Sequence, residues 1–70
     1  MDRRFIPSSN LLGVRYQPYT GVLEVEFHNG RVYQYFEVPG QLYTALMQAP
    51  SHGRFFNFHI RDHFPYRQVR

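Results

Sequence analysis

Apolar and polar residues alternate in two stretches of the first half of the chain, and each stretch predicts a β-strand. From Leu12 to Tyr16 the apolar residues are separated by Gly13 and Arg15, the period-2 pattern of a half-buried strand. Residues 22–28 repeat the pattern more regularly. One face of this second strand is apolar and the other is polar, with Leu23, Val25 and Phe27 opposed to Glu24, Glu26 and His28.

An Asn29-Gly30 pair follows the second strand and predicts a hairpin. We expect a two-residue type I′ turn, because Asn and Gly both accept the positive φ that this turn needs at its two central positions. Such a turn fixes the register of a third strand. That register places Val32 and Phe36 on the core face. The polar face then carries Glu24, Glu26, His28, Arg31, Tyr33 and Tyr35.

The second half of the chain predicts two short helices. Apolar residues recur at i, i+3, i+4 and i+7 over residues 39–49, which is typical of an amphipathic helix, and Pro50 ends this helix. Ser51 is a good N-cap for a second helix over about residues 52–61. The apolar positions are Leu42, Ala45, Leu46 and Ala49 in the first helix and Phe55, Phe56 and Ile60 in the second.

Three strands followed by two helices predict an α+β fold, a three-stranded antiparallel meander with both helices packed on one sheet face. We expect one domain over residues 1–70 with a core of about 7–66 and flexible ends, so that residues 67–70 form a frayed tail. Phe5-Ile6 is a candidate for an additional edge strand.

The composition narrows the class of protein. The 70 residues include seven Phe and six Tyr, and each ring can bury roughly 150–250 Å², which a domain this small needs for a dense core. The absence of cysteine excludes disulfides and Cys-based zinc sites and fits a reducing cytoplasm.

No apolar run approaches the roughly 20 residues of a membrane span, and the N-terminal residues lack the apolar core of a secretory signal. We therefore expect a cytoplasmic protein without membrane contact, and no motif indicates a cofactor.

All eight basic residues are Arg, and the net charge is +3. Arginine offers a planar fork of donors suited to phosphates and aromatic faces, so this composition favours nucleic acid as a partner. An alternative origin is a GC-rich genome that favours arginine codons.

Two groups of residues are candidates for nucleic-acid contact. Tyr33 and Tyr35 could stack unpaired bases, with Arg31 on phosphate; the alternative is that these rings are covered inside the domain. The start of the second helix is a candidate anion site, and the alternative there is a simple helix cap. The residues of this second group are Ser51, Gly53, Arg54, Asn57 and Arg61. Arg67 and Arg70 could extend the contact or belong to a solvated tail.

The histidines predict neither a metal site nor a catalytic one. His59 and His63 are four residues apart, but two ligands fall short of the three or four of a zinc site. General acid–base cleavage of RNA by a histidine pair needs a geometry across the phosphate that the sequence does not establish. A His-dependent nuclease is therefore kept only as an alternative.

Several segments together resemble the KTSC domain family. They are Ser8-Ser9 before a strand ending in Tyr16, Leu23 to Phe27 with Asn29-Gly30, Tyr33-Gln34-Tyr35 leading to Val38-Pro39, and Ala49 to Asn57 with Ile60-Arg61. The family pattern has Ala followed directly by Ser, whereas here Pro50 intervenes. Members occur at the C-terminus of some lysyl-tRNA synthetases and as small bacterial and phage proteins. The resemblance implies a neighbourhood of tRNA rather than an activity.

We expect a non-catalytic module that binds RNA or single-stranded DNA. The alternative is a protein-interaction module or homodimer that uses its Tyr- and Phe-rich surface, since these residues are enriched at interfaces.

Overall fold

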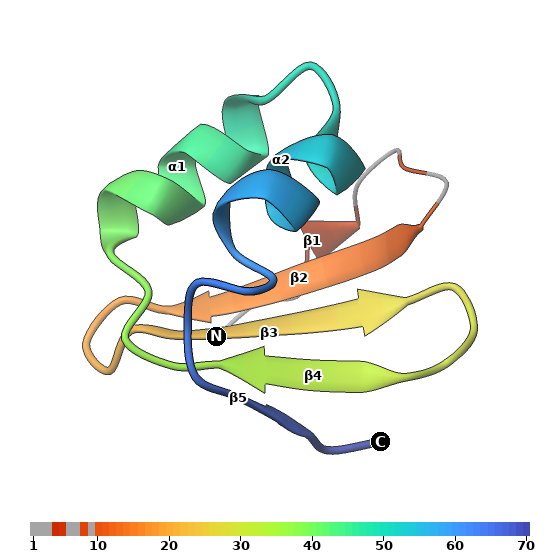
Figure 1. The fold of residues 1–70 in the computed structure, drawn as a ribbon, viewed down its shortest axis with the longest axis horizontal. Helices are drawn as coiled ribbons and strands as arrows, with labels where there is room; N and C mark the ends of the chain where they lie inside the picture. The colour runs from red at the N-terminus through yellow and green to blue at the C-terminus, as the bar shows by residue number, and fades with distance from the viewer. Residues whose placement is uncertain (1–3, 6–7, 9) are drawn as a thin grey trace.

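The computed structural model describes residues 4, 5, 8 and 10–70. Its core is an antiparallel sheet with two helices on one face (Figure 1). The elements in chain order are β1 (Arg4–Phe5), β2 (Leu11–Gln17), β3 (Val22–Phe27), β4 (Val32–Tyr35), α1 (Gly40–Gln48), α2 (His52–His59) and β5 (Tyr66–Gln68). The α+β class and the two helices of the prediction are confirmed.

The sheet has five strands in the order β1-β2-β3-β4-β5, so the prediction of three was wrong. Both additional strands are short edge strands. Arg4 and Phe5 pair with β2, which confirms an edge strand at Phe5, while Ile6 lies outside the described residues. At the other edge, Tyr66 to Gln68 pair with β4. The expected frayed tail is therefore wrong, because the backbone of Val32 also bonds to Val69 and Arg70.

The hairpin between β3 and β4 differs from the prediction by one residue. Its loop has three residues, because the Phe27 amide donates to the Arg31 carbonyl at 2.9 Å and the Gly30 amide donates to the Phe27 carbonyl at 3.0 Å. Only Gly30 adopts a positive φ, of 88°, as in a type I turn followed by a G1 bulge. Asn29 instead uses its Oδ1 to accept the Arg31 amide at 3.0 Å.

This loop shifts the register and turns β4 over. Tyr35 pairs with Leu23 and Tyr33 pairs with Val25, so the two tyrosines lie on the core face. A one-residue slip moves every side chain of a strand to the opposite face. Val32 was predicted on the core face but pairs with Glu26 on the outer one; its side chain is nevertheless buried. The predicted polar tyrosine face is thus wrong.

The Gly30→Ala variant tests this loop. We expect it to lower the free energy of unfolding by about 1 kcal/mol, since a Cβ is strained at positive φ although nothing lies within 4 Å of the position it would occupy. Gly40→Ala is the matched control, because Gly40 begins α1 with its Cβ position 3.8 Å from the nearest side-chain atom, the Tyr16 hydroxyl. Urea unfolding measures both. An equal cost at the two positions would contradict the loop geometry.

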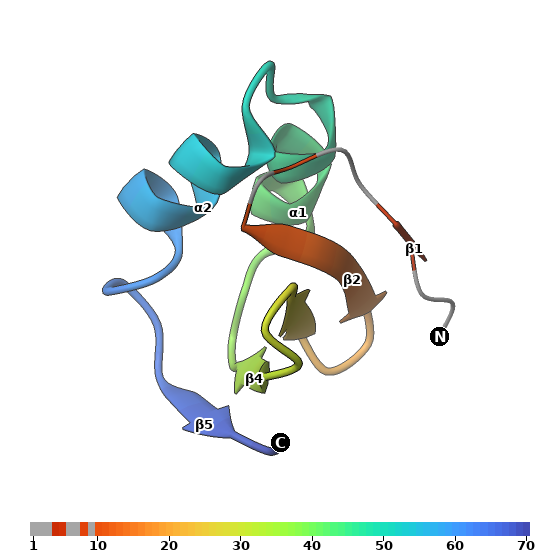
Figure 2. The ribbon, with the colours of Figure 1, turned by 90° about the vertical axis from the view of Figure 1, so that its right-hand side faces the viewer.

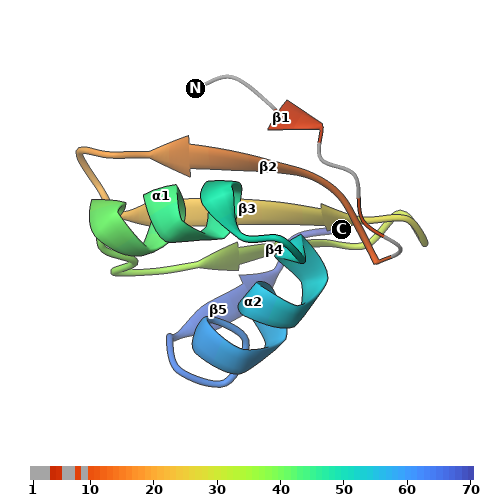
Figure 3. The same ribbon diagram turned by 90° about the horizontal axis from the view of Figure 1, so that it is seen from above.

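The two helices cover different parts of the same sheet face. α1 lies above the β2–β3 side and α2 above the β4–β5 side (Figure 3). Tyr16 secures α1, because its ring stacks on Tyr43 at 4.6 Å and its hydroxyl donates to the Val38 carbonyl at 2.6 Å. Phe56 of α2 is buried against Phe27 and Tyr35. Within the described residues, no helix is long and apolar enough to cross a membrane.

The end-on view shows how the last segment follows from this packing. After α2, the chain descends past the edge of the sheet and returns as β5 beside β4 (Figure 2). The segment after α2 therefore lies beside β4, although the two are far apart in the sequence.

Candidate functional site

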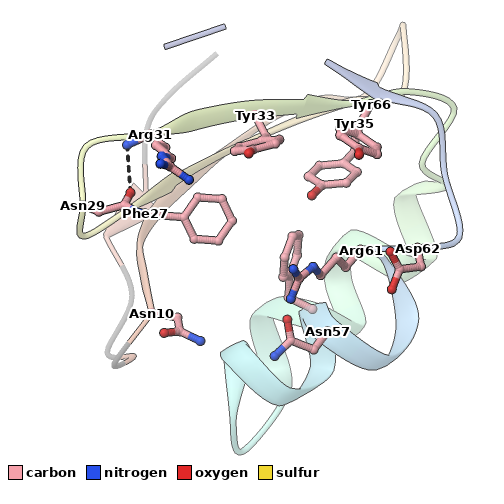
Figure 4. Close-up of a pocket in the computed structure, with 11 residues that line it drawn as sticks. Asn10, Phe27, Asn29, Arg31, Tyr33, Tyr35, Asn57, Arg61, Asp62 and Tyr66 are labelled. Carbon is pink, nitrogen blue, oxygen red and sulfur yellow. Dashed lines mark hydrogen bonds between the residues drawn. The ribbon is translucent and has the colours of Figure 1, made fainter. Parts of the chain in front are cut away.

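A cleft of about 320 Å³ opens between β4, β5 and α2. Figure 4 shows polar and aromatic side chains directed into it from both sides. Its lining residues are Asn10, Phe27, Asn29, Arg31, Tyr33, Tyr35, Phe56, Asn57, Arg61, Asp62 and Tyr66. Five of the eight residues predicted for nucleic-acid contact are among them, namely Arg31, Tyr33, Tyr35, Asn57 and Arg61.

Aromatic rings form the sheet side of the cleft. Tyr33 lies edge-on to Phe27 with ring centroids 5.7 Å apart, and the ring of Tyr66 lies 5.9 Å from Tyr33 and 5.6 Å from Tyr35. These rings come from three different strands, and the register of β4 brings them to one face. The cleft wall is thus apolar in its body and carries phenolic hydroxyls.

The two predicted stacking tyrosines are not equally accessible. Tyr35 is only 3% exposed, so the prediction that it is an exposed stacking platform is wrong: it packs edge-on against Phe56 at 5.3 Å. Tyr33 is half-buried, and its hydroxyl donates to Gln68 Oε1 at 3.2 Å. Tyr66 is 58% exposed and offers the largest open ring surface of the three.

Arginine and amide side chains form the rest of the lining. Arg31 lies just before β4 and Arg61 just after α2, both exposed. Within the described part of the chain, neither guanidinium forms a hydrogen bond or ion pair with another residue. Glu24 and Glu26 were expected beside the tyrosines, where they would repel phosphate. They lie instead on the outer sheet face, because their partners are Gln34 and Val32.

The Tyr35 hydroxyl titrates abnormally. Burial raises its pKa to about 12, although the positive charge of Arg61 opposes the rise. The neighbouring Tyr33, Tyr66 and Asp62 add smaller effects in the upward direction. The hydroxyl therefore keeps its proton at neutral pH and can donate a hydrogen bond.

A second hollow, also of about 320 Å³, lies at the start of α2. It is lined by the other three residues predicted for nucleic-acid contact, which are Ser51, Gly53 and Arg54. Asn57 lines it as well as the cleft. Ser51 is the N-cap, as predicted: its Oγ accepts the Arg54 amide at 3.4 Å. Gly53 has a packing role, since a Cβ there would lie 3.3 Å from Ser8 Oγ. Asn10 and Asn57 line both hollows.

The C-terminal arginines do not reach the cleft. Arg67 pairs with Gln34 on the outer face of the sheet, where its Nη2 donates to Gln34 Oε1 at 3.4 Å. Arg70 forms an ion pair with Glu26 at 2.8 Å. A solvated tail is therefore wrong for these residues, because they are paired with β4 and their side chains bond across the outer face.

The histidines are dispersed. α2 ends at His59, so His63 lies in the following turn rather than one turn further along the helix. His59 packs on Phe55 with ring centroids 4.4 Å apart, and His52 Nδ1 lies 2.8 Å from the Leu46 carbonyl oxygen. Among the described residues, no three side chains of the His, Cys, Asp or Glu type come together as metal ligands.

Comparison with known proteins places this geometry in a family. The family model described as the KTSC domain matches residues 7–64. The chain belongs to the KTSC domain family. A crystal structure of a KTSC domain protein from Yersinia pestis superimposes with a TM-score of 0.92 at 36% identity, over 99% of this chain and 97% of that chain.

Curated relatives of this KTSC domain are of two kinds. A lysine–tRNA ligase of Nostoc sp. is 42% identical over 55 residues, which are 79% of this chain and 10% of the ligase. An uncharacterized protein of Stutzerimonas stutzeri is 39% identical over 70 residues, 99% of both chains. The KTSC domain thus spans about a tenth of the ligases that it matches and nearly the whole of the Stutzerimonas stutzeri protein.

Sequence reasoning missed several residues that line the cleft of this KTSC domain. They are Asn10, Phe27, Asn29, Phe56, Asp62 and Tyr66. Most were interpreted as core, turn or tail residues, because nothing local in the sequence indicates that these segments meet. Tyr66 is the residue that the sequence could have indicated. Once β5 is paired with β4, Tyr66 lies beside Tyr35 and adds a third tyrosine to the Tyr33-Gln34-Tyr35 motif.

Proposed function

We propose that this KTSC domain is a non-catalytic module that binds single-stranded nucleic acid in the cleft between β4, β5 and α2. The observation that carries the proposal is the placement of Arg31 and Arg61 around a partly open aromatic wall, with neither guanidinium paired to any residue that the structure describes. Proteins that hold single strands combine a positive groove with rings on which bases stack. Tyr66 and Tyr33 supply those rings in this cleft.

The relatives support RNA as the ligand class. Lysine–tRNA ligases carry a region 42% identical to this chain, and a domain appended to an enzyme with a tRNA substrate gains from affinity for RNA. A net charge of +3 carried entirely by arginine agrees with a weakly attractive surface for a polyanion. Single strands are favoured over duplexes because only unpaired bases can enter an aromatic cleft.

The nuclease alternative lacks support in the cleft. No histidine is among the described residues that line it, whereas acid–base cleavage needs proton-transfer groups within hydrogen-bond reach of the reacting phosphate. Incubation of labelled RNA with the protein, with and without a chelator, tests this directly. Cleavage that follows the protein through purification would contradict the non-catalytic proposal.

The protein-interaction alternative rests on exposed apolar side chains. Phe58 is 71% exposed on α2 and Phe5 is 70% exposed on β1, but single exposed residues on separate elements are ordinary. Light scattering over a concentration series distinguishes this alternative. A dimer that persists at low micromolar concentration would favour it.

The Arg31→Gln/Arg61→Gln variant tests the nucleic-acid proposal. We expect its affinity for a fluorescent single-stranded RNA decamer to fall about 10-fold or more at low salt. The salt dependence should also flatten, with the slope of log K against log salt changing by about 0.7 for each phosphate contact that is lost. Fluorescence anisotropy at several salt concentrations measures both quantities.

A matched pair of single variants controls for net charge. Arg61→Gln and Arg67→Gln remove the same charge from exposed positions, but Arg67 lies on the outer sheet face. Only Arg61→Gln should weaken binding appreciably. Equal effects of the two variants would remove the cleft assignment, and a wild-type protein that binds no oligonucleotide at millimolar concentration would overturn the proposed function.

A further inference from the structure

The Tyr35 hydroxyl reaches the cleft at the tip of an almost wholly buried side chain. Its residue is 3% exposed, and within the described part of the chain the hydroxyl forms no hydrogen bond. Figure 4 shows it directed from β4 into the cleft, toward Arg61. The hydroxyl is not among the fully buried polar atoms that lack a partner, so it is open to the cleft, where a ligand can supply a hydrogen-bond partner. A phenylalanine would fill the same space without this polar atom, so the hydroxyl is available to a ligand at this end of the cleft.

The hydroxyl and the Arg61 side chain both offer donors to a ligand. Arg61 carries only N–H donors, and its charge acts on Tyr35 strongly enough to oppose the effect of burial on the pKa. A tyrosine hydroxyl is protonated at neutral pH, so it too can donate. A ligand that enters this end must therefore present acceptors. Asp62, which follows Arg61 in the lining, offers an acceptor at the neighbouring position.

Guanine is the base that matches this arrangement best. Its N7 and O6 are two adjacent acceptors, which an arginine fork can bond together, whereas adenine places the N6 donor beside its N7. Guanine also carries N–H donors on its opposite edge, for which the amide of Asn10, on the far side of the cleft from Asp62 in Figure 4, provides an acceptor. A volume of about 320 Å³ lies at the small end of ligand pockets, as expected for one base rather than a base pair.

We propose that the cleft holds a single unpaired guanine, with Tyr35 and Arg61 donating to its O6 and N7 edge. This inference rests on the nucleic-acid-binding function proposed above and specifies its ligand. The aromatic ring of Tyr66 and the half-buried ring of Tyr33 then contact the face of the base, and Arg31 lies where the backbone leaves the cleft.

Four RNA pentamers of sequence UUXUU, with X as G, A, C or U, test the proposal by anisotropy at fixed moderate salt. The guanine pentamer should bind at least 10-fold more tightly than the other three. Replacing its guanine by 7-deazaguanine, which lacks the N7 acceptor, should remove most of this preference.

Two protein variants complete the test. Arg61→Lys keeps the positive charge but loses the fork, so the ratio of its affinities for UUGUU and UUUUU should fall to near one. Tyr35→Phe should also lose the preference. With Arg61→Lys, 7-deazaguanine should have no further effect, because the same contact is already gone. If Tyr35→Phe fails to fold, Arg61→Lys and 7-deazaguanine still decide the question, since Arg61 is exposed.

The outcomes separate this inference from the proposed function. Equal affinity for the four pentamers, together with weaker binding by Arg31→Gln/Arg61→Gln, would overturn the guanine proposal and leave the nucleic-acid function intact. Tighter binding of another base would also overturn it. Absence of binding to every pentamer and to the decamer would overturn both.

Discussion

The Phe56→Ala variant is expected to lose about 3–5 kcal/mol of unfolding free energy and to unfold largely at room temperature. Phe56 is 2% exposed, and its ring contacts Phe27 at 5.8 Å and Tyr35 at 5.3 Å, both edge-on. It is the buried side chain through which α2 packs on the sheet. Alanine would leave a cavity there, and a domain of this size has only a few kcal/mol of net stability.

Phe58→Ala is the matched control for this prediction. It makes the same chemical change two residues further along α2, where the side chain is 71% exposed, so its cost should stay within about 0.5 kcal/mol. Urea unfolding followed by circular dichroism measures both variants. Similar stabilities would mean that α2 does not pack on the sheet through Phe56.

The second large effect is a loss of stability at alkaline pH caused by Tyr35. Its pKa is about 12 in the folded protein, raised from 10.0 chiefly by burial. Because the fold favours the protonated phenol, the stabilisation is complete below pH 10 and is lost as pH rises from 10 to 12. A shift of two pKa units corresponds to about 2–3 kcal/mol.

Tyr35→Phe isolates this contribution. Phenylalanine keeps the contact with Phe56 but cannot ionise, so the variant should lose about 2–3 kcal/mol less than the wild type between pH 9 and pH 12. The two proteins share every other titrating group, so the difference between their pH-dependent changes in unfolding free energy contains only the contribution of Tyr35. A difference near zero in urea unfolding at the two pH values would contradict the buried position of the hydroxyl.

The sequence predicted the helices well, and the reasons are local. Pro39, Pro50 and the Ser51 cap limit α1 and α2 directly, and the spacing of apolar residues identifies their buried sides. β5 could not be predicted in this way. Tyr66 to Gln68 form a short strand whose side chains are all exposed, so no apolar alternation distinguishes it from a tail.

The register of β4 was the decisive error. Asn29-Gly30 suits a two-residue turn and a three-residue loop equally, and in Val32-Tyr33-Gln34-Tyr35 either face has apolar side chains to offer the core. Burial of Tyr35 against Phe56 of α2 selects between them, which is a tertiary effect. The cleft could not be predicted for the same reason, since its residues come from segments between Asn10 and Tyr66 that meet only in the folded chain.

The three-residue loop has a consequence for protein engineering. A two-residue turn at Asn29 and Gly30 would pair His28 with Arg31 in place of the Phe27–Arg31 pair, and every side chain of β4 would then change faces. Tyr33 and Tyr35 would leave the core side and join Glu24 and Glu26, while Gln34 would face Phe56. The length of this one loop therefore decides which face of β4 lies toward the helices, and a change in it would exchange the two side-chain surfaces of the strand.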